Sequence, residues 1–261
     1  MLELPVLSYL HLPLLAAVLA RTTGFFVVVP FFSTEAAPLP LRGGLAFAVA
    51  LLLYPLHSPE SLPESAVAVA LVILLEVAVG LFLGWLVRVL FAGLQLAGQL
   101  AGFGIGLSLA QVIDPSSTTQ DSVGPALYQY LGLVLFVVAG GHRELLGALL
   151  DSYRVLPIGG ATFTGGLLDS TLVLVGAMFE TGLRLAAPVA ALLFLVDLVL
   201  TLANRVVPQI PILMVGMPVK TWLGLAALGW GLAAFAGPAM VWVGRADELI
   251  LAASQLMGAG R

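Results

Sequence analysis

Cysteine is absent from this 261-residue chain, and charged residues make up only 9% of it. The absence of thiols excludes disulfide bonds, thiol catalysis and cysteine-ligated metal sites. The three histidines, His11, His57 and His142, lie in separate segments, and none has a second ligand at a metal-binding spacing. No phosphate-binding loop, dinucleotide fingerprint or nucleophile elbow occurs. The sequence therefore predicts no metal, no cofactor and no catalytic residues.

Basic residues are few and scattered. Lysine and arginine together number 10 against 14 acidic residues, and they form neither a basic patch nor a polybasic arm. Binding to nucleic acid needs a concentration of positive charge along one surface. We therefore expect no nucleic-acid partner.

Apolar residues dominate what is present: 61% of the chain is hydrophobic, and the mean hydropathy is +1.12. Such a composition predicts an integral membrane protein. Because the polar stretches are too short to bury a core of their own, we expect one helical membrane domain over residues 1–261, with a short amphipathic tail at about 245–261. We expect six to eight hydrophobic helices, built on apolar runs at about 12–32, 44–56, 66–90, 94–110, 126–139, 167–202 and 212–243.

Prolines interrupt two of these regions. As a single helix the run 167–202 would be about 50 Å long, so we expect a bend or a split at Pro188. Pro208, Pro211 and Pro218 follow one another closely, and this spacing predicts a rigid turn between hairpin arms rather than one regular helix.

A glycine-rich stretch ends in Asp114-Pro115, which stops the helix. Small residues recur there at every fourth position and would form one smooth helical stripe that another backbone can approach closely. Amides that are costly to leave unpaired flank the stripe. Two interpretations stay open, a subunit interface or pore lining and a helix crossing inside one bundle. The residues concerned are Gln95, Gly98, Gln99, Gly102, Gly106 and Ala110.

Charged residues interrupt the apolar runs. Between Phe179 and Leu200 the apolar side chains favour insertion by about 4 to 7 kcal/mol, whereas three central charges would cost about 7 to 10 kcal/mol. These charges must therefore be paired, or they must mark an ion or proton path. Glu180 and Arg184 can pair along one helix face, which leaves Asp197 in need of another partner. The expected buried charges are Arg21, Glu76, Arg88, Glu180, Arg184, Asp197 and Lys220.

Motifs in a characteristic order give the chain a family resemblance. It resembles the FliR family of flagellar export-apparatus proteins, whose relatives in injectisomes form the SctT family. Besides the charged region near Arg21, the motifs are PFFSTEAAPLPLRGGLAFAVALLLYP at 30–55, AGQLAGFGIGLSLAQVIDP at 97–115, GGHRELLGALLDSYRVLPIG at 140–159 and NRVVPQIPILMVGMPVK at 204–220. The pair Gly141-His142, followed by Leu-Pro-Ile-Gly, looks more flagellar than injectisome-like.

The resemblance implies an all-α subunit in which a FliP-like and a FliQ-like unit are joined in tandem. It implies assembly with FliP-type and FliQ-type subunits into a portal for unfolded flagellar substrates, in contact with FlhA-type and FlhB-type components. The expected location is the flagellum basal body in the bacterial inner membrane.

The resemblance also implies a channel plug at 107–115, directly after the glycine-rich helix. The family often has aromatic residues there, whereas this chain offers smaller apolar ones, Leu107, Leu109, Val112 and Ile113. A ring of apolar side chains at a constriction excludes water and ions. The alternative is that these side chains pack in a core.

Two other functional classes stay open. One is a secondary ion or solute transporter that uses the intramembrane charges. The other is an intramembrane hydrolase that pairs Ser108 with His142.

Overall fold

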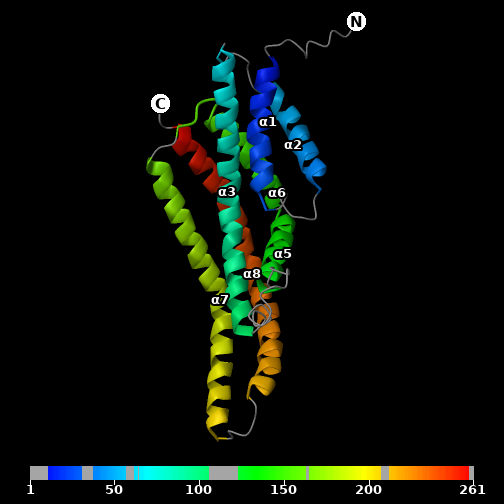
Figure 1. The fold of residues 1–261 in the computed structure, drawn as a ribbon, viewed down its shortest axis with the longest axis vertical. Coiled ribbons are helices and arrows are strands. Elements are labelled where there is room, and N and C mark those ends of the chain that lie inside the picture. The colour runs from blue at the N-terminus through cyan, green and yellow to red at the C-terminus, as the bar shows by residue number, and fades with distance from the viewer. Residues whose placement is uncertain are drawn as a thin grey trace. The chain divides into compact units, whose positions relative to one another are not determined.

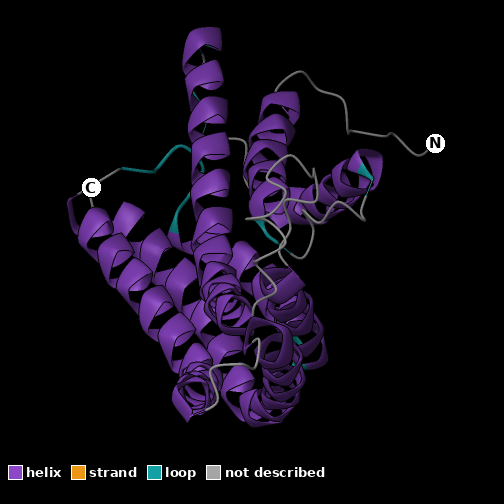
Figure 2. Cartoon of the chain, turned by 60° about the horizontal axis from the view of Figure 1, so that its bottom comes forward, coloured by secondary structure: helices purple, strands orange, loops and turns teal. Residues whose placement is uncertain are grey.

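All regular structure in the described part of the chain is helical. The computed structural model describes residues 11–30, 38–56, 62–63, 65–105, 123–162, 165–206 and 212–258. Within these residues no strand occurs (Figure 2). The helices (Figure 1) are α1 His11–Val28, α2 Leu39–Leu53, the short 3₁₀ helix η2 Tyr54–Leu56, α3 Ala66–Ile105, α5 Val123–Val138, α6 Gly141–Val155, α7 Gly165–Val206 and α8 Ile212–Gly258. The prediction of an all-α protein is confirmed.

Among the described residues, two helices are long and apolar enough to cross a membrane. They are α3, with 40 residues, and α7, with 42. A third crossing is available if α5 and α6, which meet at a 75° bend, form one broken span. At 1.5 Å per residue α3 is about 60 Å long, about twice the thickness of a bilayer's hydrocarbon core. These helices agree with the predicted membrane protein.

The chain divides into two compact units that interleave along the sequence. The first unit contains Met1–Val89, Gly141–Leu174 and Gly244–Arg261, and the second contains Leu90–Gly140 and Val175–Val243. The boundaries fall inside α3, α7 and α8. Each unit is described by itself below.

The core of the first unit is built from α1, the first part of α3, and α6. Helix α1 lies against α2, and Leu14 and Phe25 of α1 are buried. On α6 the buried side chains recur at helical spacing, at Leu145, Leu149 and Tyr153, whereas the charged residues Arg143, Glu144 and Arg154 are exposed.

The C-terminal part of α8 also belongs to the first unit. Ile250, Ala253 and Met257 are buried, and the backbone N–H and hydroxyl of Thr162 both donate to the Met257 carbonyl, each over 2.9 Å. Residues 248–258 of the predicted tail therefore form a packed helix.

The core of the second unit is a layer of small and aliphatic side chains. Small residues at every fourth position of α3 let neighbouring helices come close. The members of this layer are Ala97, Ala101 and Ile105 of α3, Tyr128 of α5, and Ala186, Val189 and Leu193 of α7.

Two elements differ from the sequence-based expectation. The runs 66–90 and 94–110 form a single helix as far as Ile105, because Gly93 packs against the Met178 backbone instead of breaking α3. Helix α6 lies between the apolar runs 126–139 and 167–202, where no helix was predicted. At Pro188, where a bend or a split was expected, α7 continues as one helix, so the split does not occur. Pro208 and Pro211 lie outside the described residues, whereas Pro218 lies within α8.

Candidate functional site

A buried ion pair lies at the centre of the first unit. Nε of Arg21 on α1 donates to Oε2 of Glu76 on α3 over 2.5 Å, and both side chains are completely buried. Further hydrogen bonds to the polar atoms of a buried ion pair help to offset the cost of taking its charges out of water. The Arg21–Glu76 pair agrees with internal pairing, one of the two interpretations of the intramembrane charges.

The end of α6 supplies hydrogen bonds to Nη1 of Arg21, whereas Nη2 is buried without a hydrogen-bond partner among the described residues. Nη1 of Arg21 donates to the carbonyls of Ser152, at 3.3 Å, and Leu156, at 3.0 Å. The Ser152 carbonyl lies in the last turn of α6 and also accepts from the Leu156 N–H over 2.8 Å, whereas Leu156 lies just beyond the end of the helix. The guanidinium also lies over the Tyr153 ring, with Cζ 4.2 Å from the ring centroid. One cation thus ties α1 to both α3 and α6.

The second oxygen of Glu76 holds the connection that follows α6. Its Oε1 accepts a hydrogen bond of 2.9 Å from the backbone N–H of Gly159. Gly159 has a φ of +73°, a conformation in which glycine avoids the strain of a side chain. The Leu-Pro-Ile-Gly motif is therefore the turn that brings a backbone donor to Glu76.

Glycines bring α1 and α3 close enough for this pair to form. A methyl group added to Gly24 would lie 2.8 Å from the Val77 carbonyl oxygen, and one on Gly84 would lie 2.8 Å from that of Phe25. One on Gly80 would overlap the Arg21 backbone. Backbone therefore meets backbone at this crossing, as in small-xxx-small helix pairs.

A second close crossing, between α3 and α5, accounts for two residues of the predicted glycine stripe. A Cβ on Gly98 would lie 2.5 Å from the Gly124 carbonyl oxygen, and Gly102 also faces Gly124. Nearby, Nε2 of Gln95 donates to Oε1 of Gln129 over 2.8 Å. The contacts of Gly98 and Gly102 agree with the alternative of a crossing inside one chain.

For the other residues of the predicted glycine stripe, no contact decides between a subunit interface and a crossing inside the chain. Gln99 is exposed in this chain. Gly106 and Ala110 lie outside the described residues, as do all four residues proposed for the channel plug, Leu107, Leu109, Val112 and Ile113. A subunit interface at this stripe and the plug both stay predictions.

Four of the remaining intramembrane charges form pairs on α7 and α8. Nη2 of Arg184 lies 2.5 Å from Oε1 of Glu180, as the spacing predicted. Asp197 finds its partner in Lys220 of α8, whose Nζ contacts Oδ1. Arg88 is exposed, and no ion pair joins it to another described residue. In this chain Glu180 and Arg184 are also exposed, so their burial stays a prediction.

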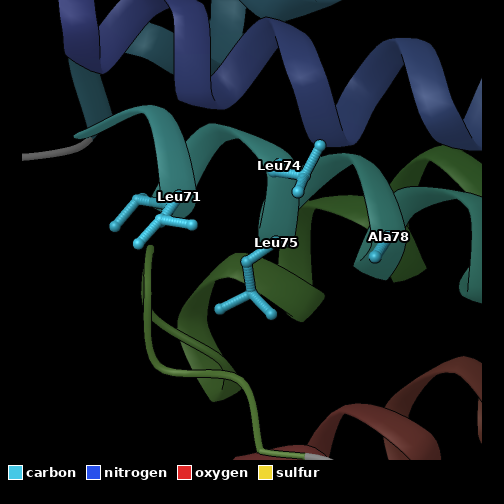
Figure 3. Close-up of a pocket in the computed structure, with 5 residues that line it drawn as sticks. Leu71, Leu74, Leu75 and Ala78 are labelled. Atoms are coloured by element: carbon cyan, nitrogen blue, oxygen red, sulfur yellow. The ribbon is translucent and has the colours of Figure 1, made fainter. Parts of the chain in front are cut away.

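An apolar hollow on the first part of α3 is lined by residues that cannot act in catalysis. Its volume is about 430 Å³, and its lining includes Leu71, Leu74, Leu75 and Ala78 (Figure 3). None of these side chains can act as an acid, a base or a nucleophile. The hollow is suited only to apolar contact.

No candidate catalytic group is assembled among the described residues. His142 is half-buried on α6, and its Nδ1 is buried without a hydrogen-bond partner there. Its hypothetical partner, Ser108, lies outside the described residues. The described residues contain no group of three side chains that could hold a metal.

Several residues of the Arg21 network were not predicted from the sequence. Ser152, Tyr153 and Leu156 were missed because the four charges of α6 made it resemble a loop, although its buried residues recur at helical spacing. Gly80 and Gly84 carried a usable signal, since they form a small-xxx-small pair inside an apolar run. Gly159 gave no signal that its N–H would meet a carboxylate.

Comparison with known proteins gives a consistent result. The sequence profile described as Bacterial export proteins, family 1, matches residues 12–243. The Escherichia coli (strain K12) protein named Flagellar biosynthetic protein FliR is 29% identical over 210 residues, 80% of either chain. The protein of that name from Bacillus subtilis (strain 168) is 32% identical over 217 residues, 80% of this chain and 82% of the relative. The one from Caulobacter vibrioides is 29% identical over 237 residues, 90% of this chain and 93% of the relative.

Proposed function

Because the chain belongs to the Bacterial export proteins, family 1, and is similar to flagellar FliR proteins over most of its length, we propose that it is a non-enzymatic subunit of the flagellar protein export gate. In that gate it assembles with FliP-type and FliQ-type subunits to form the portal through which unfolded flagellar substrates enter. The family match over residues 12–243 is the observation that carries this proposal.

The distribution of apolar side chains supports a role in a larger assembly. Large apolar residues are exposed along α2 and α7, among them Leu52, Leu41, Phe194 and Val173. An apolar face this extensive needs lipid or other protein to cover it. A subunit that completes its fold in an assembly has such faces.

The proposed location is the bacterial inner membrane at the flagellum basal body. There FlhA-type and FlhB-type components would contact the gate. The three flagellar relatives favour this system over an injectisome of the SctT type.

The ion pairs weigh against a secondary transporter. Transporters keep acidic side chains available near the membrane centre for a coupling ion. Here Glu76, Glu180 and Asp197 each lie against a cation of the same chain. A fixed counter-ion competes with a transported one, so the export gate is the better account.

Deletion of the gene tests the proposal. We expect the strain to lose flagellin export and swimming motility, and a plasmid copy of the chain to restore both. Normal flagella in the deletion strain would refute the proposed function. Uptake of a solute or ion that depends on this chain without any partner would favour the transporter instead.

The plug at 107–115 is part of the proposal and has its own test. Replacing Leu109 and Val112 with glycine removes apolar side chains that would exclude water from the constriction. We expect the assembled gate carrying both changes to leak ions in planar bilayers, while the wild-type gate stays closed. Equal conductance would show that these residues do not form a seal.

A further inference from the structure

The connection that follows α6 is tied to the buried ion pair at two points. Its described part is 156–162, which belongs to the first unit together with α1 and the first part of α3. Nη1 of Arg21 donates to the Leu156 carbonyl over 3.0 Å, and the Gly159 N–H donates to Oε1 of Glu76 over 2.9 Å. The conformation of this connection therefore decides whether both members of the ion pair keep a backbone partner there.

The end of α8 holds the same connection at a third point. The backbone N–H and the hydroxyl of Thr162 both donate to the Met257 carbonyl, each over 2.9 Å. This carbonyl lies in the last turn of α8, where helical carbonyls need partners from outside the helix. The Met257 side chain is completely buried, and a Cβ on Gly258 would lie 3.2 Å from the Val155 carbonyl oxygen at the end of α6. The last turn of α8 is thus packed against α6 and capped by Thr162.

A tight turn joins these attachment points. The Gly160 N–H donates to the Pro157 carbonyl over 2.9 Å, and proline holds its own φ near one value. Gly159 has a φ of +73°, and only two residues separate it from Thr162. A short turn that is closed by its own hydrogen bond has little slack, so a displacement of Thr162 also displaces the Gly159 N–H.

We propose that the last turn of α8 is a latch for the buried ion pair. When it is seated on Thr162, the connection keeps the Gly159 N–H on Glu76. When it is released, the connection loosens and the Glu76 carboxylate loses this donor. Because the latch lies at residue 257 and the ion pair at residues 21 and 76, the first unit reaches its final packing only when the end of the chain is in place. The latch operates whether or not the chain is a gate subunit.

Hydrogen exchange at the Gly159 N–H of the full chain in detergent micelles tests the latch. Met257→Ala removes a completely buried side chain from the last turn of α8, so we expect exchange at Gly159 to become at least about tenfold faster. The matched control is Leu14→Ala, which truncates a buried side chain of α1 in the same unit; here we expect a change of less than about twofold, because local opening of the connection leaves α1 packed. Unchanged exchange at Gly159 in Met257→Ala, or equal acceleration in both variants, would overturn the proposal.

A milder pair of variants gives a second test if the alanine variants fail to fold. Thr162→Val keeps the size of the side chain and removes one of the two hydrogen bonds to the Met257 carbonyl, so we expect exchange at Gly159 to become about fivefold faster. The control is Thr171→Val, which removes a hydroxyl that donates to a carbonyl of its own helix α7, and we expect less than about twofold. Equal rates at Gly159 in the two variants would contradict the latch.

Discussion

Replacing Glu76 with glutamine tests the buried ion pair most sharply. The substitution keeps the size of the side chain and keeps a carbonyl oxygen for the Gly159 N–H, so it removes the charge with little other change. Arg21, completely buried, then keeps only its contacts with α6. Removing one partner of a buried ion pair costs about 3 to 5 kcal/mol. We expect the free energy of unfolding to fall by about 3 kcal/mol. This value is at the lower end of that range because the Ser152 and Leu156 carbonyls still bind the guanidinium.

The assay is reversible unfolding of the purified chain in mixed micelles, followed by circular dichroism over an SDS titration. The double variant Arg21→Gln/Glu76→Gln completes a thermodynamic cycle, and we expect it to be less destabilised than the two single changes added together, because neither residue is left as an unpaired charge. The control is Arg154→Gln, since the exposed Arg154–Asp151 pair is expected to contribute less than about 1 kcal/mol. A fall of under about 0.5 kcal/mol for Glu76→Gln, similar to that of a surface pair, would refute the reasoning.

Two further predictions concern the second unit. Gly98→Ala should destabilise the chain in the same titration, because its Cβ would lie 2.5 Å from the Gly124 carbonyl oxygen. The control is Gly147→Ala, where nothing lies within 4 Å of the added methyl group, and it should stabilise the chain by up to about 1 kcal/mol through helix propensity. Equal effects of the two substitutions would contradict the close crossing. Asp197→Asn should weaken the α7–α8 hairpin by removing the partner of Lys220, and faster proteolysis near 207–211 would measure this; an unchanged cleavage rate would show that the pair does not hold the hairpin.

The membrane class and most helices were predictable because they depend on local composition. Apolar runs of about 20 residues indicate spans whatever their surroundings are. What failed was the prediction of where helices join or stop. Gly93 resembles a break in the sequence, but its packing against Met178 keeps α3 continuous. Tertiary contacts of this kind cannot be deduced from a local window.

The charge pairs show the same difference between local features, which the sequence predicts, and tertiary contacts, which it does not. The Glu180–Arg184 pair is local, and its spacing was sufficient to predict it. The sequence supplied Arg21, Glu76, Asp197 and Lys220 as charges in need of partners, but the assignment of Arg21 to Glu76 depends on a helix crossing 55 residues away in the sequence. The contribution of α6 was missed because a polar helix that packs on one face resembles a loop when only its average hydropathy is considered.

Native mass spectrometry of the chain co-expressed with the FliP-type and FliQ-type proteins of the same genome tests the central claim most directly. The account predicts that a defined hetero-oligomer containing this chain is released intact from detergent. A chain that appears only alone or with copies of itself, while the other two proteins assemble without it, would contradict the claim that it is a subunit of the export gate.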